Sequence, residues 1–421
     1  MSRTQMTCDF VLVVFCGLFW SSGLFGDDTS PIAIQLTDPL PYGQKPIDYF
    51  GAPLPNPIEH LKQRLESDEF QLGTNEQHGF LSALLKELDI SPTSQVLVFS
   101  KTALNPKLVS PETPRAVYFN EETYVGYVPG AASLEIATVD PVKGWLFYTL
   151  TQPEFSPTKQ NRPRPTLERE RQCLACHAGQ SSLRVPGGLV RGFVPDEKGN
   201  PLSGYSRINH ETDFEKRFGG WYLTGQHGRL THRGNIFDSK TGPARPLMSN
   251  PNNRKDLTGV FDTSRYLSAH SDLVAQMLLH HQVHGQNLLI RVGYEARFGK
   301  RSDAEEQLVR YLLFADEAPL TGPLSGSTAF AEWFQKRGTV DSQERNLREW
   351  NLKTHLFQHR LSYLIRSRLF VNLPQPVKDR LYDRMQKVLS NEKSPLSDHR
   401  RNEEERKTLR AIVKDLKKGG P

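Results

Sequence analysis

The sequence contains few cysteines and only one long apolar run. Four cysteines occur in 421 residues, and two of them, Cys8 and Cys16, lie close to the N-terminus. The other two, Cys173 and Cys176, are separated by two residues. Because one close pair cannot cross-link a chain of this length, a disulfide scaffold is excluded. The apolar run at residues 10–20 is short for a bilayer, and no later segment could span one, so no membrane span is expected in the mature chain.

Residues 1–26 have the pattern of a secretory signal peptide. A short polar head containing Arg3 precedes the apolar run, and the small residues of SSGLFG follow it. This pattern predicts an exported, periplasmic protein from which residues 1–26 are removed, with an uncleaved anchor as the alternative. Residues 27–58 contain seven prolines and are expected to form an extended lead-in on the surface.

The remaining cysteine pair belongs to the stretch RQCLACHAGQ at residues 171–180. The spacing of Cys173, Cys176 and His177 is the attachment pattern of c-type haem. The two thiols add to the vinyl groups of the porphyrin, and the histidine becomes the proximal iron ligand. A zinc site would need a further ligand, and a redox dithiol would not need the histidine, but both remain alternatives. With no other cysteine after residue 26, one covalent haem is expected.

Hydrophobic periodicity predicts an α+β fold with a β-rich N-terminal half and a mainly helical C-terminal half. The expected domains are a β-rich haem-binding region at 59–265 and a helical region at 266–421 packed on it. Antiparallel strands are predicted at residues 95–100, 116–120, 123–128, 133–138 and 145–150, and further strands at 189–194, 204–208 and 220–224. Helices are predicted at residues 59–65, 78–88, 166–172, 271–297, 303–314, 342–370, 376–389 and 398–418.

The sixth iron position decides between a closed electron carrier and an iron that binds other molecules. Histidines far outnumber the three methionines after residue 26, so histidine is the favoured ligand. The candidates are His281, on the apolar stripe of the predicted helix 271–297, and His227 and His232 in a nearby loop. A histidine on an apolar stripe is more often a hydrogen-bonded core residue. His227 with Arg229, or His232 with Arg233, could also cleave peroxide, and an ordinary basic loop is the plainer interpretation.

The charge pattern points to an acidic protein partner. The net charge is +6, a mild excess for this length, and nucleic acid is not expected as a partner because basic and acidic residues alternate in an exported chain. Four arginines precede the haem motif, and they could form a basic rim that docks an acidic redox partner. The alternative is a solvated face in which these side chains pair with Glu168 and Glu170. The four are Arg162, Arg164, Arg169 and Arg171.

Four stretches together resemble a family of exported bacterial proteins called cytochrome c domain-containing proteins. They are SPETPRAVYFNEETYVGYVPG (110–130), CLACH, FGGWYLTGQHG (218–228) and HSDLVAQMLLHHQ (270–282). The resemblance extends from about Pro46 to the last helices and implies one covalent haem c on Cys173, Cys176 and His177, without implying a particular reaction. Members of that family carry glutamate where this chain has His280, and methionine where it has Arg233.

Electron transfer by a mono-haem c-type cytochrome is therefore the predicted function. Two alternatives stay open, a haem-dependent oxidoreductase of the peroxidase type and a haem-based sensor of redox state or a gas. The chain left after residue 26 is large for a simple carrier, which is the reason to keep both. Whether the protein is an enzyme is left undecided by the sequence.

Overall fold

The structure is a computed structural model that describes residues 31–67, 70–153, 164–202, 204–239, 242–248, 250–390 and 401–419. The predicted signal peptide at 1–26 lies outside the described residues. Residues Ile32–Pro421 form one unit. Within the described parts of the chain, no helix combines the length and the apolar character that crossing a bilayer requires.

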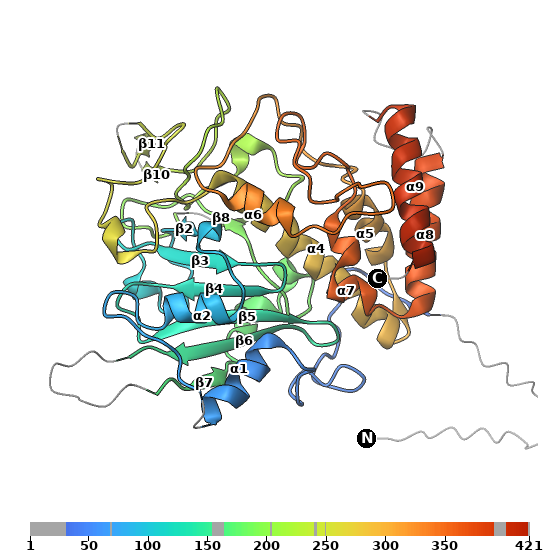
Figure 1. The fold of residues 1–421 in the computed structure, drawn as a ribbon, viewed down its shortest axis with the longest axis horizontal. Coiled ribbons are helices and arrows are strands. Elements are labelled where there is room, and N and C mark those ends of the chain that lie inside the picture. The colour runs from blue at the N-terminus through green and yellow to red at the C-terminus, as the bar shows by residue number, and fades with distance from the viewer. Residues whose placement is uncertain are drawn as a thin grey trace, which may run out of the picture. The chain divides into compact units, whose positions relative to one another are not determined.

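A six-stranded antiparallel sheet lies in the N-terminal half, as the β-rich runs separated by turns predicted (Figure 1). Its strands follow one another in the order of the sequence, each hydrogen-bonded to the next. They are β2 (Val96–Val98), β3 (Arg115–Phe119), β4 (Thr123–Tyr127), β5 (Ser133–Asp140), β6 (Gly144–Thr151) and β7 (Leu167–Arg169). With helices in the C-terminal half, this sheet confirms the α+β class.

The strand register places every second residue of β3 to β6 on one face of the sheet. One cross-strand row joins Val117, Gly126, Glu135 and Thr149. Tyr124, Ala137 and Phe147 form the neighbouring row. On the other face, the Tyr148 hydroxyl donates to the Glu59 carboxylate (2.7 Å) in helix α1 (Pro57–Glu66). Figure 1 shows α1 and α2 (Leu81–Glu87) in front of the sheet, which leaves the face with Glu135 and Phe147 for other contacts.

The helix predicted at residues 166–172 is wrong. Thr166 and the glutamates after it resemble a helix start, but Leu167–Arg169 pairs with β6 as the edge strand β7. The only helical turn here is α3 (Leu174–His177), inside the haem motif itself. The strands predicted on the far side of the motif are much shorter than expected, β8 (Arg191–Gly192) and β9 (Ser206–Arg207). Residues 220–224 form isolated bridges rather than a strand.

The long helix α4 (Leu273–Arg297) is the centre of the C-terminal half. The Asp272 carboxylate caps it by accepting the Ala275 backbone N–H (2.9 Å). Almost all of α4 is buried, because sheet, loops and helices enclose it. The other helices of this half are α5 (Ala304–Leu312), α6 (Phe330–Lys336), α7 (Arg368–Val371), α8 (Gln375–Ser390) and α9 (Glu403–Gly419), and α8 and α9 pack as the red pair of Figure 1.

The helix predicted at residues 342–370 is also wrong. Glu344 and Leu352 have positive φ angles, which a helix does not allow, and Trp350 pairs with Phe357 in a β-bridge. Only the short turns at Tyr363–Arg366 and α7 are helical in this stretch.

The proline-rich lead-in is tied to the unit by buried contacts. The strand β1 (Ile32–Ala33) pairs with β12 (Lys300–Arg301), and the Arg291 guanidinium on α4 donates to the backbone oxygens of Gln35 and Asp38. Tyr49 is fully buried, and its hydroxyl donates to the Trp145 carbonyl oxygen (2.8 Å). The remaining pair of strands is β10 (Ile236–Ser239) with β11 (Gly242–Pro246).

Candidate haem-attachment site

The three motif residues lie on and beside the single turn of α3. The His177 backbone N–H donates to the Cys173 carbonyl oxygen (2.9 Å), which closes the turn. Cys176 is exposed, whereas Cys173 and His177 are half-buried. Both cysteines are free thiols. A turn of this kind presents two thiols and an imidazole within one short segment, as attachment of a c-type haem requires.

The imidazole of His177 is held by the segment that follows the motif. His177 Nδ1 lies 2.8 Å from the Gly187 carbonyl oxygen, and the Gly187 N–H donates to the His177 carbonyl oxygen (2.8 Å). Because a carbonyl only accepts, the proton is on Nδ1 and the Nε2 lone pair is left for a metal. Burial lowers the pKa of His177 to about 4, so the imidazole is neutral at pH 7.

Helix α4 fixes this holding segment in turn. The Asn287 side chain accepts the Gly188 N–H (2.9 Å) and donates to the Gly188 carbonyl oxygen (2.8 Å). A Cβ on residue 188 would lie 2.3 Å from the Trp145 ring, so only glycine fits between α4 and the sheet. The orientation of His177 therefore depends on Asn287, which lies more than one hundred residues later in the sequence.

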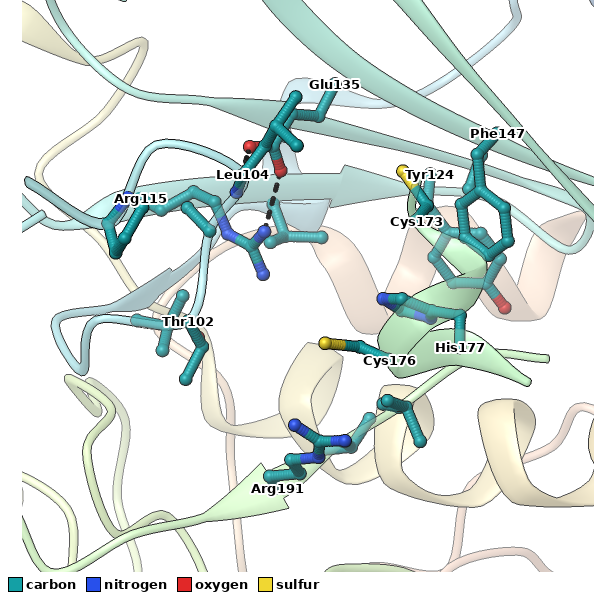
Figure 2. A pocket seen from close by; sticks show the side chains of 18 of the residues that line it. Thr102, Leu104, Arg115, Tyr124, Glu135, Phe147, Cys173, Cys176, His177 and Arg191 are labelled. Atoms are coloured by element: carbon teal, nitrogen blue, oxygen red, sulfur yellow. Dashed lines mark hydrogen bonds and ion pairs between the residues drawn. The ribbon is translucent and has the colours of Figure 1, made fainter. Parts of the chain in front are cut away.

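A cavity of about 530 Å³ opens beside the motif (Figure 2). Its walls are the alternate residues on the free face of β3 to β6, the loop after β2, the segment around β8, and Leu279 and Val283 of α4. Cys173, Cys176 and His177 all line it, and Figure 2 shows the Cys176 sulfur and the His177 ring directed into it. The volume is in the range of cofactor pockets, and most of the lining side chains are apolar or aromatic.

The charged groups in the lining are Lys101 in the loop after β2, Arg115 on β3, Glu135 on β5 and Arg191 on β8. The Arg115 guanidinium on β3 donates to the Glu135 carboxylate on β5 (2.7 Å), which also accepts the Leu104 N–H of the loop after β2 (2.8 Å). Arg191 on β8 lies over the Tyr205 ring, 4.1 Å from its centre. The Nε atoms of Arg115 and Arg191 and the Trp145 indole nitrogen are buried without a hydrogen-bond partner.

The local chemistry bears on the alternatives for the cysteine pair. Burial raises the pKa of Cys173 to about 12, with Glu170 and Glu135 acting in the same direction, so this thiol is not the activated thiolate of a redox dithiol. In the described residues, no three side chains of His, Cys, Asp or Glu gather closely enough to hold a metal ion.

His281 is not brought to the cavity. It is fully buried on α4, with Nδ1 2.7 Å from His210 Nδ1 and Nε2 2.7 Å from the Ser362 hydroxyl. Its ring stacks on Tyr311 and Phe314. Both nitrogens are occupied by protein partners, which is the core-histidine interpretation that the apolar stripe also allowed.

The loop histidines are likewise remote from the cavity lining and bonded to each other. His227 Nδ1 lies 2.8 Å from the Leu230 carbonyl oxygen, and His227 Nε2 accepts the Asn253 N–H (2.9 Å). His232 Nδ1 accepts the Gly234 N–H, and its Nε2 lies 3.2 Å from His227 Nε2. Arg229 and Arg233 are exposed and do not line the cavity either, so the peroxide-cleaving pair considered for this loop is not assembled there.

The predicted basic rim is only partly present in the described residues. Arg162 lies outside them. Arg169 is used internally, because its guanidinium donates to the Gly51 carbonyl oxygen (2.9 Å) and lies over Tyr49. Arg171 is exposed and covers the exposed Phe50 ring, and Arg164 is exposed at the edge of the sheet.

Sequence reasoning missed Arg115, Glu135, Arg191 and Asn287. The two-residue alternation of the strands could have placed Arg115 and Glu135 on one face, but no local pattern brings α4 to Gly188. Comparison with known proteins adds no relative, since no family model, no curated protein and no solved structure matches the chain. The resemblance to the cytochrome c domain-containing family stays a prediction from the sequence.

Proposed function

We propose that this chain is an exported mono-haem c-type cytochrome that takes part in electron transfer. Cys173 and Cys176 would hold one haem c through thioether bonds, and His177 would be a ligand to its iron. The observation that carries the proposal is that both thiols and the imidazole line one cavity of about 530 Å³. An apolar pocket of this size beside the attachment motif fits a haem.

The residues around the cavity suit an electron carrier. When bound, haem c supplies an iron that changes between the ferrous and ferric states and so carries one electron. The bond from His177 Nδ1 to Gly187 fixes the imidazole plane and raises the basicity of Nε2. The aromatic and aliphatic walls offer an apolar surface to the porphyrin. Ala175 and Cys176 are exposed, so the attachment edge lies where a partner protein can approach it.

A second candidate is a haem-dependent oxidoreductase of the peroxidase type. The observation that favours it is the composition of the lining: among the described residues of the cavity wall, His177 is the only histidine and there is no methionine. A site without a second strong ligand of that kind leaves room for a small molecule opposite His177. The lack of a second histidine or a methionine in the described lining also favours a haem-based sensor. A sensor would bind a small molecule at the iron without converting it to a product.

The test is expression of the full chain in a periplasm that matures c-type haem. Haem that stays on the polypeptide through denaturing electrophoresis is expected for the wild type. It should be lost in Cys173→Ala/Cys176→Ala, whereas His60→Ala, on the exposed face of α1, should retain it as the matched control. Absence of covalent haem from the wild type in a host that loads another c-type cytochrome would overturn the proposal.

Carbon monoxide separates the two candidates. A reduced spectrum unchanged by carbon monoxide would mean a closed iron and would favour the carrier. A shifted spectrum would mean an accessible iron, and peroxide turnover would then decide between the oxidoreductase and the sensor.

A further inference from the structure

The cavity lining carries an excess of positive charge that nothing in the proposed function has used. Three cationic side chains line it, Lys101, Arg115 and Arg191, against the one carboxylate of Glu135, which gives a net charge of +2. An apolar pocket with this excess fits a ligand that has a large apolar body and two negative charges.

The two arginines also have hydrogen-bonding capacity that the protein leaves open. Arg115 Nε and Arg191 Nε are both buried without a partner, although burying an unpaired donor costs about 1–3 kcal/mol. Arg115 uses one Nη to reach Glu135, and Arg191 rests on the Tyr205 ring without a carboxylate partner among the described residues. Such donors are most easily explained by an acceptor that occupies the cavity.

The arginines reach the cavity from different elements. Arg115 extends from β3 and Arg191 from β8, and Figure 2 shows them on different sides of the space that His177 and Cys176 face. Lys101, in the loop after β2, is the third cation of the lining. The two arginines carry the argument because they hold the buried Nε donors without a partner.

We propose that Arg191 and Arg115 bind the two carboxylates of the tetrapyrrole and so fix its orientation in the cavity. This rests on the proposed function, since it assigns the groups that receive the propionates of the attached haem. The planar guanidinium matches a carboxylate with two parallel hydrogen bonds, which lysine cannot do. Arg191 is the main anchor because no carboxylate of the described chain competes for it.

The test uses the full chain with Cys173→Ser and Cys176→Ser, so that free haem binds without becoming attached. The apoprotein is titrated with ferric haem and with its dimethyl ester, and quenching of the fluorescence of Trp145 and Trp221, which line the cavity, reports binding. In this background, haem should bind about 10- to 100-fold more tightly than the ester, the range for hydrogen bonds to a charged group.

Arg191→Gln should remove most of that preference and leave the affinity for the ester unchanged, which also shows that the pocket is intact. Arg191→Lys should restore it in part. Arg207→Gln, on the strand paired with Arg191 and outside the lining, is the matched control and should keep the full preference.

Each other outcome is informative. Equal affinity for haem and ester before any arginine is changed would overturn the carboxylate proposal while leaving the haem site in place. Loss of both affinities in Arg191→Gln would mean that Arg191 only supports the pocket, which overturns it as well. Absence of binding by either compound would overturn the assignment of this cavity as the haem pocket, and the carboxylate proposal with it, whereas covalent attachment is tested separately by denaturing electrophoresis.

A carboxylate could also come from outside the cofactor. Acetate added to the haem-loaded protein tests this, because arginines already occupied by the propionates should not respond. A spectral shift with acetate that is lost in Arg191→Gln would show a site for an external carboxylate and would overturn the proposal.

Discussion

Mild acid should destabilise this protein strongly, because it contains a cluster of buried histidines. His210, His280, His281 and His284 are almost fully buried in or against α4. Burial lowers the pKa of each of them, that of His281 to about 3, and the nearby Arg217 guanidinium lowers those of His210 and His280 further. All four are therefore neutral in the folded protein at pH 7.

The sign and the size of the effect follow from linkage. In the unfolded chain these histidines titrate near pH 6.5. Below that pH the unfolded state therefore binds more protons than the folded state, in which the histidines stay neutral. The free energy of unfolding is unaffected above about pH 7 and falls as the pH drops through 6.5, until the folded groups titrate in turn, near pH 3 for His281. Between about pH 7.5 and pH 5.5 each histidine lowers the free energy of unfolding by about 1.4 kcal/mol, and the four together lower it by about 5 kcal/mol. A loss of this size is comparable to the whole stability of many domains.

Urea unfolding of the haem-loaded protein, followed by far-ultraviolet circular dichroism at several pH values, measures this loss. His281→Gln should remove about 1.4 kcal/mol of the pH-dependent part, because one of the four groups no longer titrates. His60→Gln, on the exposed face of α1, is the control and should change nothing. The reasoning is refuted if stability stays level between pH 7.5 and 5.5, or if the two variants flatten the curve equally.

Three further predictions concern the site. Asn287→Leu should cost about 2 kcal/mol, because it leaves both Gly188 backbone groups without their buried partner, and the looser histidine should shift the reduction potential measured by redox titration. Glu135→Gln should cost about 1 kcal/mol and speed hydrogen exchange at Leu104, whose N–H binds this carboxylate, with other loops unchanged. Cys176→Ala should leave haem attached by a single thioether, seen as a longer-wavelength maximum in the reduced pyridine spectrum; an unshifted maximum would contradict attachment at Cys176.

The parts of the fold that sequence predicted well are those in which local pattern and tertiary environment agree. Five segments between residues 95 and 151 are rich in β-forming residues and separated by turns, and each forms a strand that pairs with its neighbour in the sequence. The helix predicted at 166–172 failed because Thr166, Glu168 and Glu170 resemble a helix start, while the backbone of 167–169 completes the edge of the sheet beside β6. Residues 342–370 failed because the prediction followed apolar spacing, and positive φ angles at Glu344 and Leu352 are not visible in that spacing.

The candidate site likewise has a part that a local sequence pattern indicates and a part that only the tertiary structure brings together. Cys173, Cys176 and His177 were identified because their chemistry depends on spacing within five residues. The sixth position depends on which side chains face His177 across the cavity, and these come from positions as far apart as Val98 and Val283. The number of histidines in the sequence could not identify these side chains. A histidine on an apolar helix face, such as His281, is explained equally well as a hydrogen-bonded core residue.

The chain is larger than a simple electron carrier needs, which was the reason to keep the enzyme and sensor alternatives. The way the site is built explains this size. Helix α4 supplies one wall of the cavity and, through Asn287, the support of the segment that holds His177. A helix buried on almost every side needs neighbours to cover it, and the C-terminal helices and loops provide that cover. Much of the C-terminal half therefore serves to hold α4 against the sheet, so large size alone does not favour an enzyme over a carrier. The accessibility of the iron to carbon monoxide is then the observation that separates the two.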